Sequence, residues 1–200
     1  MEEPILGEVT GLMENGYVPF GEIARAIPWP TNPELRAEND AEHSFALALV
    51  ASAVAERLGL DVGKVCQMAT VHDFVEVFAG DVSVWDDAGR IDKPAREAAS
   101  LARIATQWSH FPWLAQTIEE YERLDTPETC LVYALDKFLA IQMILQGDGY
   151  FWKNASITFA DHLAKVEEVR PPNRPPPTCP KLVQRTPVNN HSPPTRAVYT

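Results

Sequence analysis

The sequence has little of what would place the protein in a membrane or an oxidising compartment. Its 200 residues include only three cysteines, Cys66, Cys130 and Cys179, which lie far apart and form no C-x-x-C pair. A sparse, odd set of cysteines argues against a disulfide framework. No run of 18 or more apolar residues is present, and the opening MEEPILGEVTGLMENG has two acids where a secretory signal has basic residues. We therefore expect a cytoplasmic protein without a membrane span.

Basic residues are scarce outside the last part of the chain. The net charge is −11, but residues 170–200 carry five basic residues and no acid, so residues 1–169 hold about −16. Such an acidic body is a poor binder of nucleic acid, which requires clustered Lys and Arg, and no nucleic-acid partner is expected. It can still bind an anionic small molecule if a metal ion and a few local cations receive it.

Strand patterns are also weak, because apolar and polar residues alternate over no stretch of four or more. The apolar residues, 46% of the chain together with the aromatics and cysteines, recur instead with the spacing of helices. We predict an all-α domain of about six to seven helices, with an irregular connector at residues 17–38 and a loop at 79–92. The predicted helices cover residues 4–16, 40–58, 61–78, 94–106, 112–123, 127–146 and 156–169.

Several boundaries have local signals. Asn39 or Asp40 is a suitable N-cap for the second helix, and Gly59 a suitable end. Thr126-Pro127 is typical of a helix start. From Arg170 the composition changes, since residues 171–200 contain nine of the 17 prolines. We expect one domain at residues 1–169 and an extended or disordered tail at 170–200, with a polyproline ligand as the alternative for the tail.

Polar residues interrupt the apolar helical patterns at a few places, and His72-Asp73 is the first of them. Adjacent helix positions point about 100° apart, so both side chains reach one point only if it lies off the helix between them. A metal ion at that point would take an imidazole nitrogen and a carboxylate oxygen. Taken alone, the pair is better explained as a core histidine beside a chance aspartate. Glu76, one turn after His72, would hold water or substrate beside the ion.

Two further residues strengthen the metal interpretation. His43 lies on the inner side of the second helix, and Asp136 lies within the apolar segment CLVYALDKFLAIQMIL. A carboxylate there is costly unless it is paired or bound to a cation. A salt bridge with Lys137 or an arginine is the alternative for Asp136. Two histidines and two aspartates make a plausible site for one divalent metal: Mn, Fe, Co, Ni or Zn, with Mg also considered.

The order His…His-Asp…Asp resembles the signature of the HD-domain metal phosphohydrolases, which are all-α helical bundles. RAENDAEHS (36–44), H-D-x-x-E followed by G-D (72–81), EYE (120–122) and LDK (135–137) are similar to the branch that contains the bacterial 5′-deoxynucleotidases. The resemblance covers about residues 5–165. Trp152 and His162 match none of these motifs, and we expect structural roles for them.

The resemblance implies a role for each matching residue. The metal ligands would be His43, His72, Asp73 and Asp136. Glu76 would orient or activate the attacking water, and Asp81 would help to place the sugar or phosphate. For the mechanism, we expect Asp81 or a nearby water to supply the leaving-group proton. Trp29 would line the nucleoside pocket.

The chain differs from the family pattern at a residue expected to contact the phosphate. Relatives usually carry an arginine just before the tryptophan, where this chain has Pro28. Arg36 and Lys137 are the predicted substrate contacts, with Arg25 and Lys93 as further candidates. For Arg36, a salt bridge with Glu38 or Glu42 is an equal alternative.

The expected activity is the hydrolysis of a deoxynucleoside monophosphate to deoxynucleoside and phosphate. The alternatives are a triphosphohydrolase acting on dNTPs, a di-iron oxygenase and a binding module without catalysis. The oxygenase would need several histidines between the H-D pair and the last aspartate, where this chain has only His110. A homodimer or higher homo-oligomer is expected from the resemblance. The apolar positions Phe138, Ile141 and Leu145 are candidates for its interface, with core packing as the simpler role.

Overall fold

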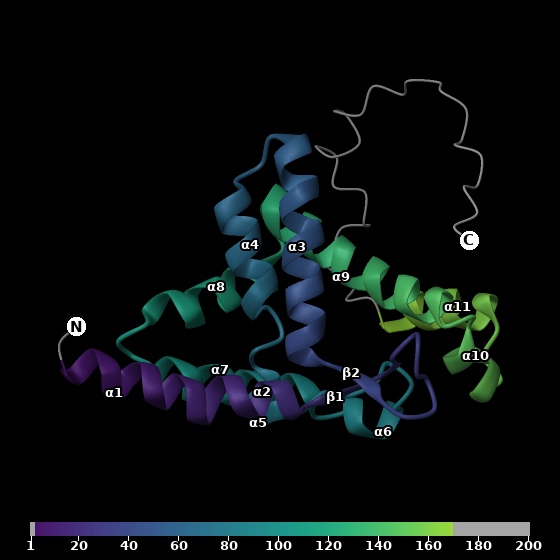
Figure 1. The fold of residues 1–200 in the computed structure, drawn as a ribbon, viewed down its shortest axis with the longest axis horizontal. Helices are drawn as coiled ribbons and strands as arrows, with labels where there is room; N and C mark the ends of the chain where they lie inside the picture. Colours follow the sequence, from purple (N-terminus) through teal and green to yellow (C-terminus); the bar gives the residue numbers. More distant parts are fainter. Residues whose placement is uncertain (1–2, 170–200) are drawn as a thin grey trace.

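A computed structural model describes residues 3–169, and the predicted tail lies outside this part of the chain. The all-α prediction is confirmed (Figure 1). The N-terminal segment forms a rod of three helical pieces, which are α1 (Glu3–Leu12), the π-helical η1 (Met13–Tyr17) and α2 (Val18–Glu22). Two short antiparallel strands follow in the predicted connector: β1 (Ala24–Pro28) and β2 (Ala37–Asn39), with Ala24 opposite Asn39.

The helical pair α3 (Asp40–Leu58) and α4 (Val62–Val71) stands across the rod in Figure 1. Asn39 caps α3 as predicted: its side chain accepts from the backbone N–H of Glu42, and the Glu42 carboxylate accepts from the N–H of Asn39. Gly59 ends the helix with a φ of 67°, a conformation that glycine adopts without a steric cost. These local caps set the start of the helix that carries His43.

The predicted continuous helix over residues 61–78 is wrong. α4 ends at Val71, residues 72–75 form a turn, and a short helix, α5 (Glu76–Ala79), follows. The backbone closes tight i to i+3 hydrogen bonds here, from Phe74 N–H to Val71 O at 3.0 Å and from Glu76 N–H to Asp73 O at 2.9 Å. The chain therefore changes course within the H-D motif, so Glu76 does not simply follow His72 on one helical face.

The remaining helices agree with the prediction more closely. α7 (Lys93–Gln107), α8 (Pro112–Arg123) and α9 (Pro127–Gln146) lie within a residue or so of the predicted bounds, and Thr126 caps α9. The predicted loop at 79–92 contains one short helix, α6 (Asp87–Arg90). After α9 come α10 (Tyr150–Asn154), which was not predicted, and α11 (Phe159–Val169), which begins three residues after the predicted start.

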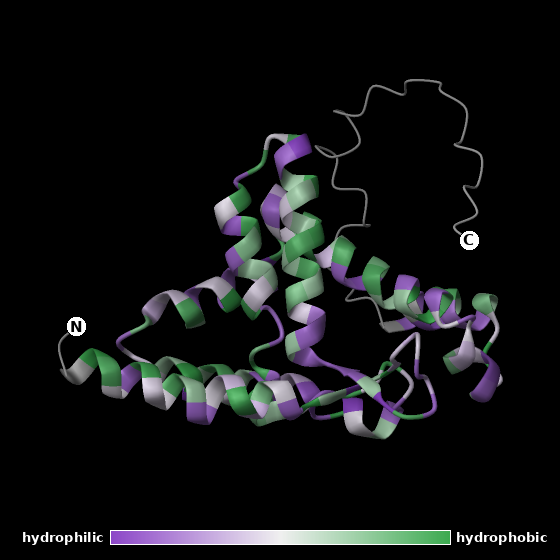
Figure 2. Ribbon diagram, viewed as in Figure 1, coloured by the Kyte–Doolittle hydropathy of each residue, from purple (hydrophilic) through white to green (hydrophobic). Residues whose placement is uncertain are grey.

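Two apolar clusters hold these helices together. One joins α3, α4, the end of α8 and the first half of α9 around residues such as Leu47, Met68 and Val132. The other joins α2, α7 and α8 to the end of α4 around Phe74, Ile104 and Trp108. Figure 2 shows the central turns of α3 as hydrophobic and both of its ends as hydrophilic. The turn that carries His72 lies between the two clusters, because Ala69 belongs to the first and Val71 to the second.

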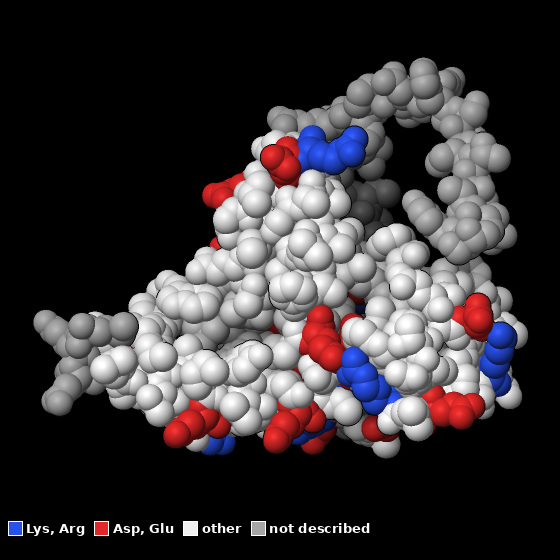
Figure 3. All heavy atoms as spheres, in the orientation of Figure 1, with Lys and Arg blue, Asp and Glu red and all other residues white. Residues whose placement is uncertain are grey.

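Part of the apolar surface remains uncovered. Phe45 and Leu49 on α3 are 73% and 65% exposed, and in Figure 3 the visible face of α3 is free of charged side chains between its two ends. On α9, Phe138 and Leu145 are also exposed, whereas Ile141 lines an internal cavity. The predicted oligomer stays a prediction. Among residues 3–169, none of the helices combines the length and apolar character required to cross a membrane.

Gly16 allows the rod to lie directly on the H-D turn. It is buried in η1, and a Cβ atom added to it would lie 2.8 Å from Cζ of Phe74 and 3.2 Å from Cζ2 of Trp108. Carbon atoms do not approach that closely without displacement. Phe74 directly follows Asp73, so this close contact also fixes the turn that carries the H-D pair.

Replacing Gly16 with Ala is expected to lower the free energy of unfolding by roughly 1–3 kcal/mol, the usual cost of overpacking a core. Gly11→Ala on the same rod is the matched control, because nothing lies within 4 Å of its added Cβ. The control should be neutral or stabilising by up to about 1 kcal/mol, since Ala favours the helix over Gly. Urea unfolding of both variants measures the difference, and equal stabilities would contradict the contact.

Candidate metal centre and its cavity

The structure brings together the four side chains that the sequence suggested as metal ligands. His43 comes from α3, His72 and Asp73 from the turn after α4, and Asp136 from the middle of α9. One donor atom of each lies within 4.8 Å of the donor atoms of the others. His43, His72 and Asp136 are buried, and Asp73 is partly exposed. The set could hold a metal ion, and the binding itself stays a prediction.

The His72 ring is oriented as a metal-binding histidine would be. Its Nδ1 lies 2.9 Å from the carbonyl oxygen of Ala69, which can only accept, so Nδ1 carries the proton. The other ring nitrogen, Nε2, lies 3.1 Å from Oδ2 of Asp73. This Nε2 is buried and has no hydrogen-bond partner among residues 3–169. Two electron-rich atoms facing each other in a buried place fit a cation between them.

Asp136 connects the second histidine to the cluster. Its Oδ1 lies 3.0 Å from Nε2 of His43, and its Oδ2 lies 2.6 Å from Nζ of Lys137. One carboxylate oxygen of Asp136 therefore faces the predicted metal ligands, and the other makes the salt bridge with Lys137 that was the alternative. Burial opposes the charge of Asp136, but Lys137 and His43 outweigh it and lower the pKa of this carboxyl.

Without a bound cation, His43 binds a proton more tightly than a free histidine does. Burial alone would lower the pKa of this imidazole, but its contacts with Asp136 and Glu38 raise the pKa to about 9. A metal ion at Nε2 would have to replace that proton, as is usual for metal sites built from histidine. The remaining Nδ1 lies 3.6 Å from Oε2 of Glu38, a carboxylate that would orient the ring from behind.

Tyr121 contacts two of the four candidate ligands, His72 and Asp136. Its ring stands edge-on to His72 with 5.4 Å between the ring centres, and its hydroxyl lies 3.5 Å from Oδ2 of Asp136. This places the EYE segment of α8, noted in the sequence, directly beside the candidate ligands.

Arg25 on β1 connects three carboxylates beside the cluster. Its Nη1 lies 2.9 Å from Oδ2 of Asp73 and 3.3 Å from Oδ1 of Asp40, and its Nε lies 3.6 Å from Oε2 of Glu38. Burial alone would lower the pKa of this guanidinium, but Asp73 and the other nearby acids raise it above its ordinary value. Burial raises the pKa of Asp40 to about 7, against the pull of Arg25.

Glu38 and Asp40 were not among the predicted residues of the site. A signal was present, because both acids stand in RAENDAEHS within five residues of His43, and buried acids next to a ligand often orient it.

Glu76 and Lys93 form a pair on another side of the cluster. Nζ of Lys93 lies 3.1 Å from Oε1 of Glu76, while the buried Oε2 has no hydrogen-bond partner within the described chain. Burial, together with Asp73 and Asp81, raises the pKa of the Glu76 carboxyl to about 10. A divalent cation near Asp73 would reverse this effect by favouring the charged carboxylate.

A cavity of about 300 Å³ extends from the cluster along α9. Asp73, Glu76, Asp81 and Asp136 line it, together with Arg25, Arg90, Lys93 and Lys137. From Asp136 to Ile144 the cavity follows eight residues of α9, which is roughly 12 Å of helix. Its other walls come from the 82–85 segment, α10 and α11. Their lining residues are Val82, Ser83, Val84, Trp85, Phe151, His162 and Leu163.

Two predicted substrate contacts lie elsewhere. Neither Trp29 nor Arg36 is among the residues that line the cavity. The Arg36 guanidinium lies 3.9 Å from the ring centre of Trp29 and makes a 2.9 Å ion pair with Glu42, the alternative considered for it. Lys137 and Asp81 do line the cavity, so the geometry supports these two positions and not the first two.

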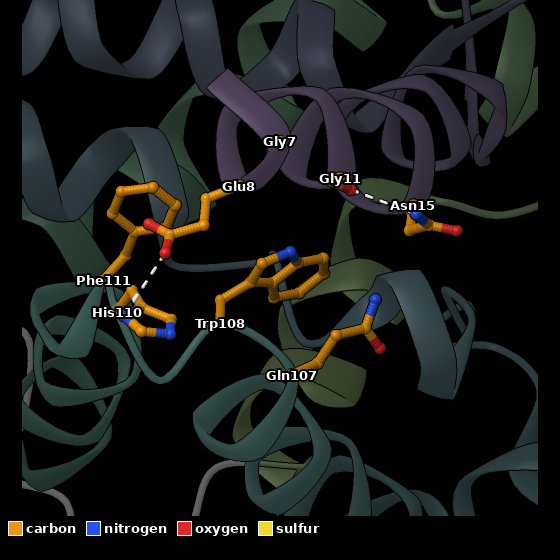
Figure 4. A pocket seen from close by; sticks show the side chains of 8 residues that line it. All are labelled: Gly7, Glu8, Gly11, Asn15, Gln107, Trp108, His110 and Phe111. Carbon is orange, nitrogen blue, oxygen red and sulfur yellow. Dashed lines mark hydrogen bonds and ion pairs between the residues drawn. The ribbon is translucent and has the colours of Figure 1, made fainter. Parts of the chain in front are cut away.

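A second cavity, of about 340 Å³, lies between α1 and the junction of α7 and α8. Figure 4 shows the Trp108 ring at its centre, with the ion pair of Glu8 and His110 on one side and Asn15 and Gln107 on the other. None of the candidate metal ligands lines it. This second cavity therefore lacks a convergent set of catalytic groups.

Comparisons with known proteins agree with this arrangement. A family model described as an HD domain matches residues 24–173. The human 5′-deoxynucleotidase HDDC2 is 28% identical over 125 residues, which are 61% of this chain and 59% of the human protein. The match thus spans less than two thirds of that relative.

Solved structures extend the likeness to most of the chain. A predicted metal-dependent phosphohydrolase from Magnetospirillum magnetotacticum is 26% identical, with a TM-score of 0.70 over 84% of this chain and 86% of its own. The PH0347 protein from Pyrococcus horikoshii is also 26% identical, with a TM-score of 0.54 over 82% of this chain and 87% of its own.

The protein is expected to bind one equivalent of a divalent transition metal, and His72→Ala should weaken that binding by at least about 100-fold, because it removes the donor that has no other partner. His110→Ala is the control, since that side chain is 70% exposed and its ion pair, with Glu8, lies away from the cluster. Metal content after gel filtration and a metal titration by calorimetry measure the effect. Retention of full metal content by His72→Ala would contradict the assignment.

Proposed function

Because this chain belongs to the HD-domain family, we propose that it is a metal-dependent phosphohydrolase that converts deoxynucleoside monophosphates to deoxynucleosides and phosphate. The observation that carries the proposal is the buried cluster of His43, His72, Asp73 and Asp136, with its unpartnered Nε2, at the wall of a cavity. The human relative that bears the name 5′-deoxynucleotidase supports the choice of a nucleotide.

The charges around the cavity fit a small anionic substrate. Its lining contains four acidic and four basic side chains, which formally cancel. A bound divalent cation would make the lining positive, which favours a phosphate monoester dianion. The net positive charge of the metal-loaded lining would match one phosphate group. A triphosphate carries a larger negative charge and would require more cations.

The pairing of the basic residues supports the same conclusion. Arg25, Lys93 and Lys137 each have an acidic partner within 3.1 Å. Arg90 has no ion pair or side-chain hydrogen bond in the described part of the chain. A single unpaired guanidinium suits one phosphate, so the observations favour the nucleotidase over the triphosphohydrolase.

The remaining walls suit a nucleoside. Beyond Lys137 the cavity is lined by Ala140, Ile141 and Ile144 of α9 and by Phe151 of α10. An apolar wall with an aromatic ring receives a flat heterocycle, while the charged wall receives the phosphate, and small-molecule sites commonly combine the two. The cavity volume of about 300 Å³ lies at the lower end of the range for such sites.

Each polar residue has a distinct task in the proposed reaction. A divalent cation, when bound, supplies a Lewis acid for a phosphate oxygen and lowers the pKa of nearby water. Glu76 holds the attacking water through its free Oε2 and accepts its proton, while Lys93 fixes Oε1. Arg25 holds the Asp73 carboxylate in place through their 2.9 Å contact. The proton that Glu76 takes from the water passes to the departing 5′ oxygen, and Asp81, at the cavity wall, is the candidate to relay it.

A substrate panel tests the proposed function directly. Purified protein with Mn²⁺, Co²⁺, Ni²⁺, Zn²⁺ or Mg²⁺ is expected to release inorganic phosphate from deoxynucleoside monophosphates. It should release little or no triphosphate from dNTPs, for the reasons of charge given above. Phosphate and triphosphate are separated by ion chromatography. Triphosphate as the main product would favour the alternative, and the absence of product from every nucleotide with every metal would refute the proposal.

Glu76→Gln is expected to lower kcat by about 100-fold or more, because the amide cannot accept the proton of water. The metal content should stay at the wild-type level, since Glu76 is not a predicted ligand. Glu97→Gln is a closely matched control, because Glu97 pairs with the same lysine at 3.4 Å but does not line the cavity. Steady-state phosphate release measures both variants. A kcat for Glu76→Gln within a few-fold of wild type would remove Glu76 from the mechanism.

A further inference from the structure

A buried histidine without a hydrogen-bond partner lies among the residues that line the cavity. His162 on α11 is only 8% exposed, it lines the cavity, and its Nδ1 is buried with no partner among residues 3–169. The side chain makes no ion pair there either. Buried polar atoms in proteins are nearly always hydrogen-bonded, so a molecule bound in the cavity can supply the partner of this nitrogen.

The neighbours of His162 make it a neutral hydrogen-bonding group. Burial lowers the pKa of its imidazole, so the ring is uncharged at neutral pH. Its ring centre lies 5.2 Å from that of Trp152, whose own Nε1 is buried without a partner in the described part of the chain. Leu163 and Phe151 line the cavity beside it. A neutral imidazole has both a donor and an acceptor nitrogen, as the edge of a nucleobase does.

A few side chains connect the helix that carries His162 to the rest of the molecule. Lys165, one turn later on α11, reaches the Asp87 carboxylate of α6 at 2.5 Å and is itself only 8% exposed. Thr158 caps the start of the helix through Asp161.

His162 reaches the cavity from α11, a helix that holds none of the candidate metal ligands. The candidate metal ligand on α9 is Asp136, and the cavity follows this helix for roughly 12 Å to Ile144, where α10 and α11 complete the wall. A nucleotide with its phosphate at Asp136 would direct its base along α9 toward these helices.

We propose that His162 determines base specificity by hydrogen-bonding the edge of the nucleobase, with Phe151 and Ile144 packing against the ring. This inference rests on the proposed nucleotidase function and names the residue that distinguishes one nucleotide from another. His162 acts on the base alone, so its contribution is absent when the substrate has no base.

The test compares substrates with and without a base. The specificity constant kcat/KM is measured for the four deoxynucleoside monophosphates and for 2-deoxyribose 5-phosphate, with wild type, His162→Phe and His162→Gln. His162→Phe should lower kcat/KM for the preferred nucleotide about tenfold and leave the base-free substrate within about twofold. His162→Gln, which keeps a donor and an acceptor, should recover part of the loss. His110→Phe, an exposed histidine away from this cavity, should change neither substrate.

The outcomes separate this inference from the proposed function. Equal losses for nucleotides and 2-deoxyribose 5-phosphate, or no loss for any nucleotide, would overturn the role of His162 while the nucleotidase activity stands. A wild-type protein inactive on every nucleotide would overturn both. If circular dichroism shows that His162→Phe does not fold, His162→Gln decides alone. We then expect this variant to change the ranking of the four bases, and an unchanged ranking would contradict the inference.

Discussion

Much of this structure is organised around two electron-rich groups, an imidazole nitrogen and a carboxylate, that face each other in a buried place. Nδ1 of His72 faces the carbonyl oxygen of Ala69, and its Nε2 is buried with no hydrogen-bond partner among residues 3–169. Close by, Asp73 and Asp136 bring negative charge that the chain compensates with Arg25, Lys137 and the ring of His43. Three helices must meet for this to occur, and a bound cation explains why they keep such costly groups together.

Local signals made a large part of the fold predictable from sequence. The caps at Asn39, Gly59 and Thr126 depend on neighbouring residues alone, and the structure has the helix ends at those residues. The four candidate ligands were also recognisable, because each is a polar residue within an otherwise apolar pattern and their order resembles a known signature. Asp136 could be identified in this way despite standing 63 residues after Asp73, since its burial alone required a partner.

Features that depend on distant contacts were missed or wrongly predicted. The turn at residues 72–75 has no glycine or proline to mark it, and it is held from outside by the hydroxyl of Ser100, which donates to the carbonyl of Val75. The β1–β2 pair brings Arg25 to Asp73, a contact across 48 positions. Trp29 and Arg36 were assigned to substrate by resemblance. Arg36 lies over the Trp29 ring and pairs with Glu42, and neither residue lines the cavity, so their substrate role stays a prediction.

The central claim is that four side chains from three parts of the fold bind one cation. Crystals grown with Mn²⁺ and measured near the manganese absorption edge test it most directly, because anomalous scattering locates the metal independently of any assumed ligand. The account predicts one peak at roughly 2.0–2.3 Å from a nitrogen of His43, a nitrogen of His72 and an oxygen of each of Asp73 and Asp136. A fully occupied metal elsewhere, with no peak among these four residues, would contradict it.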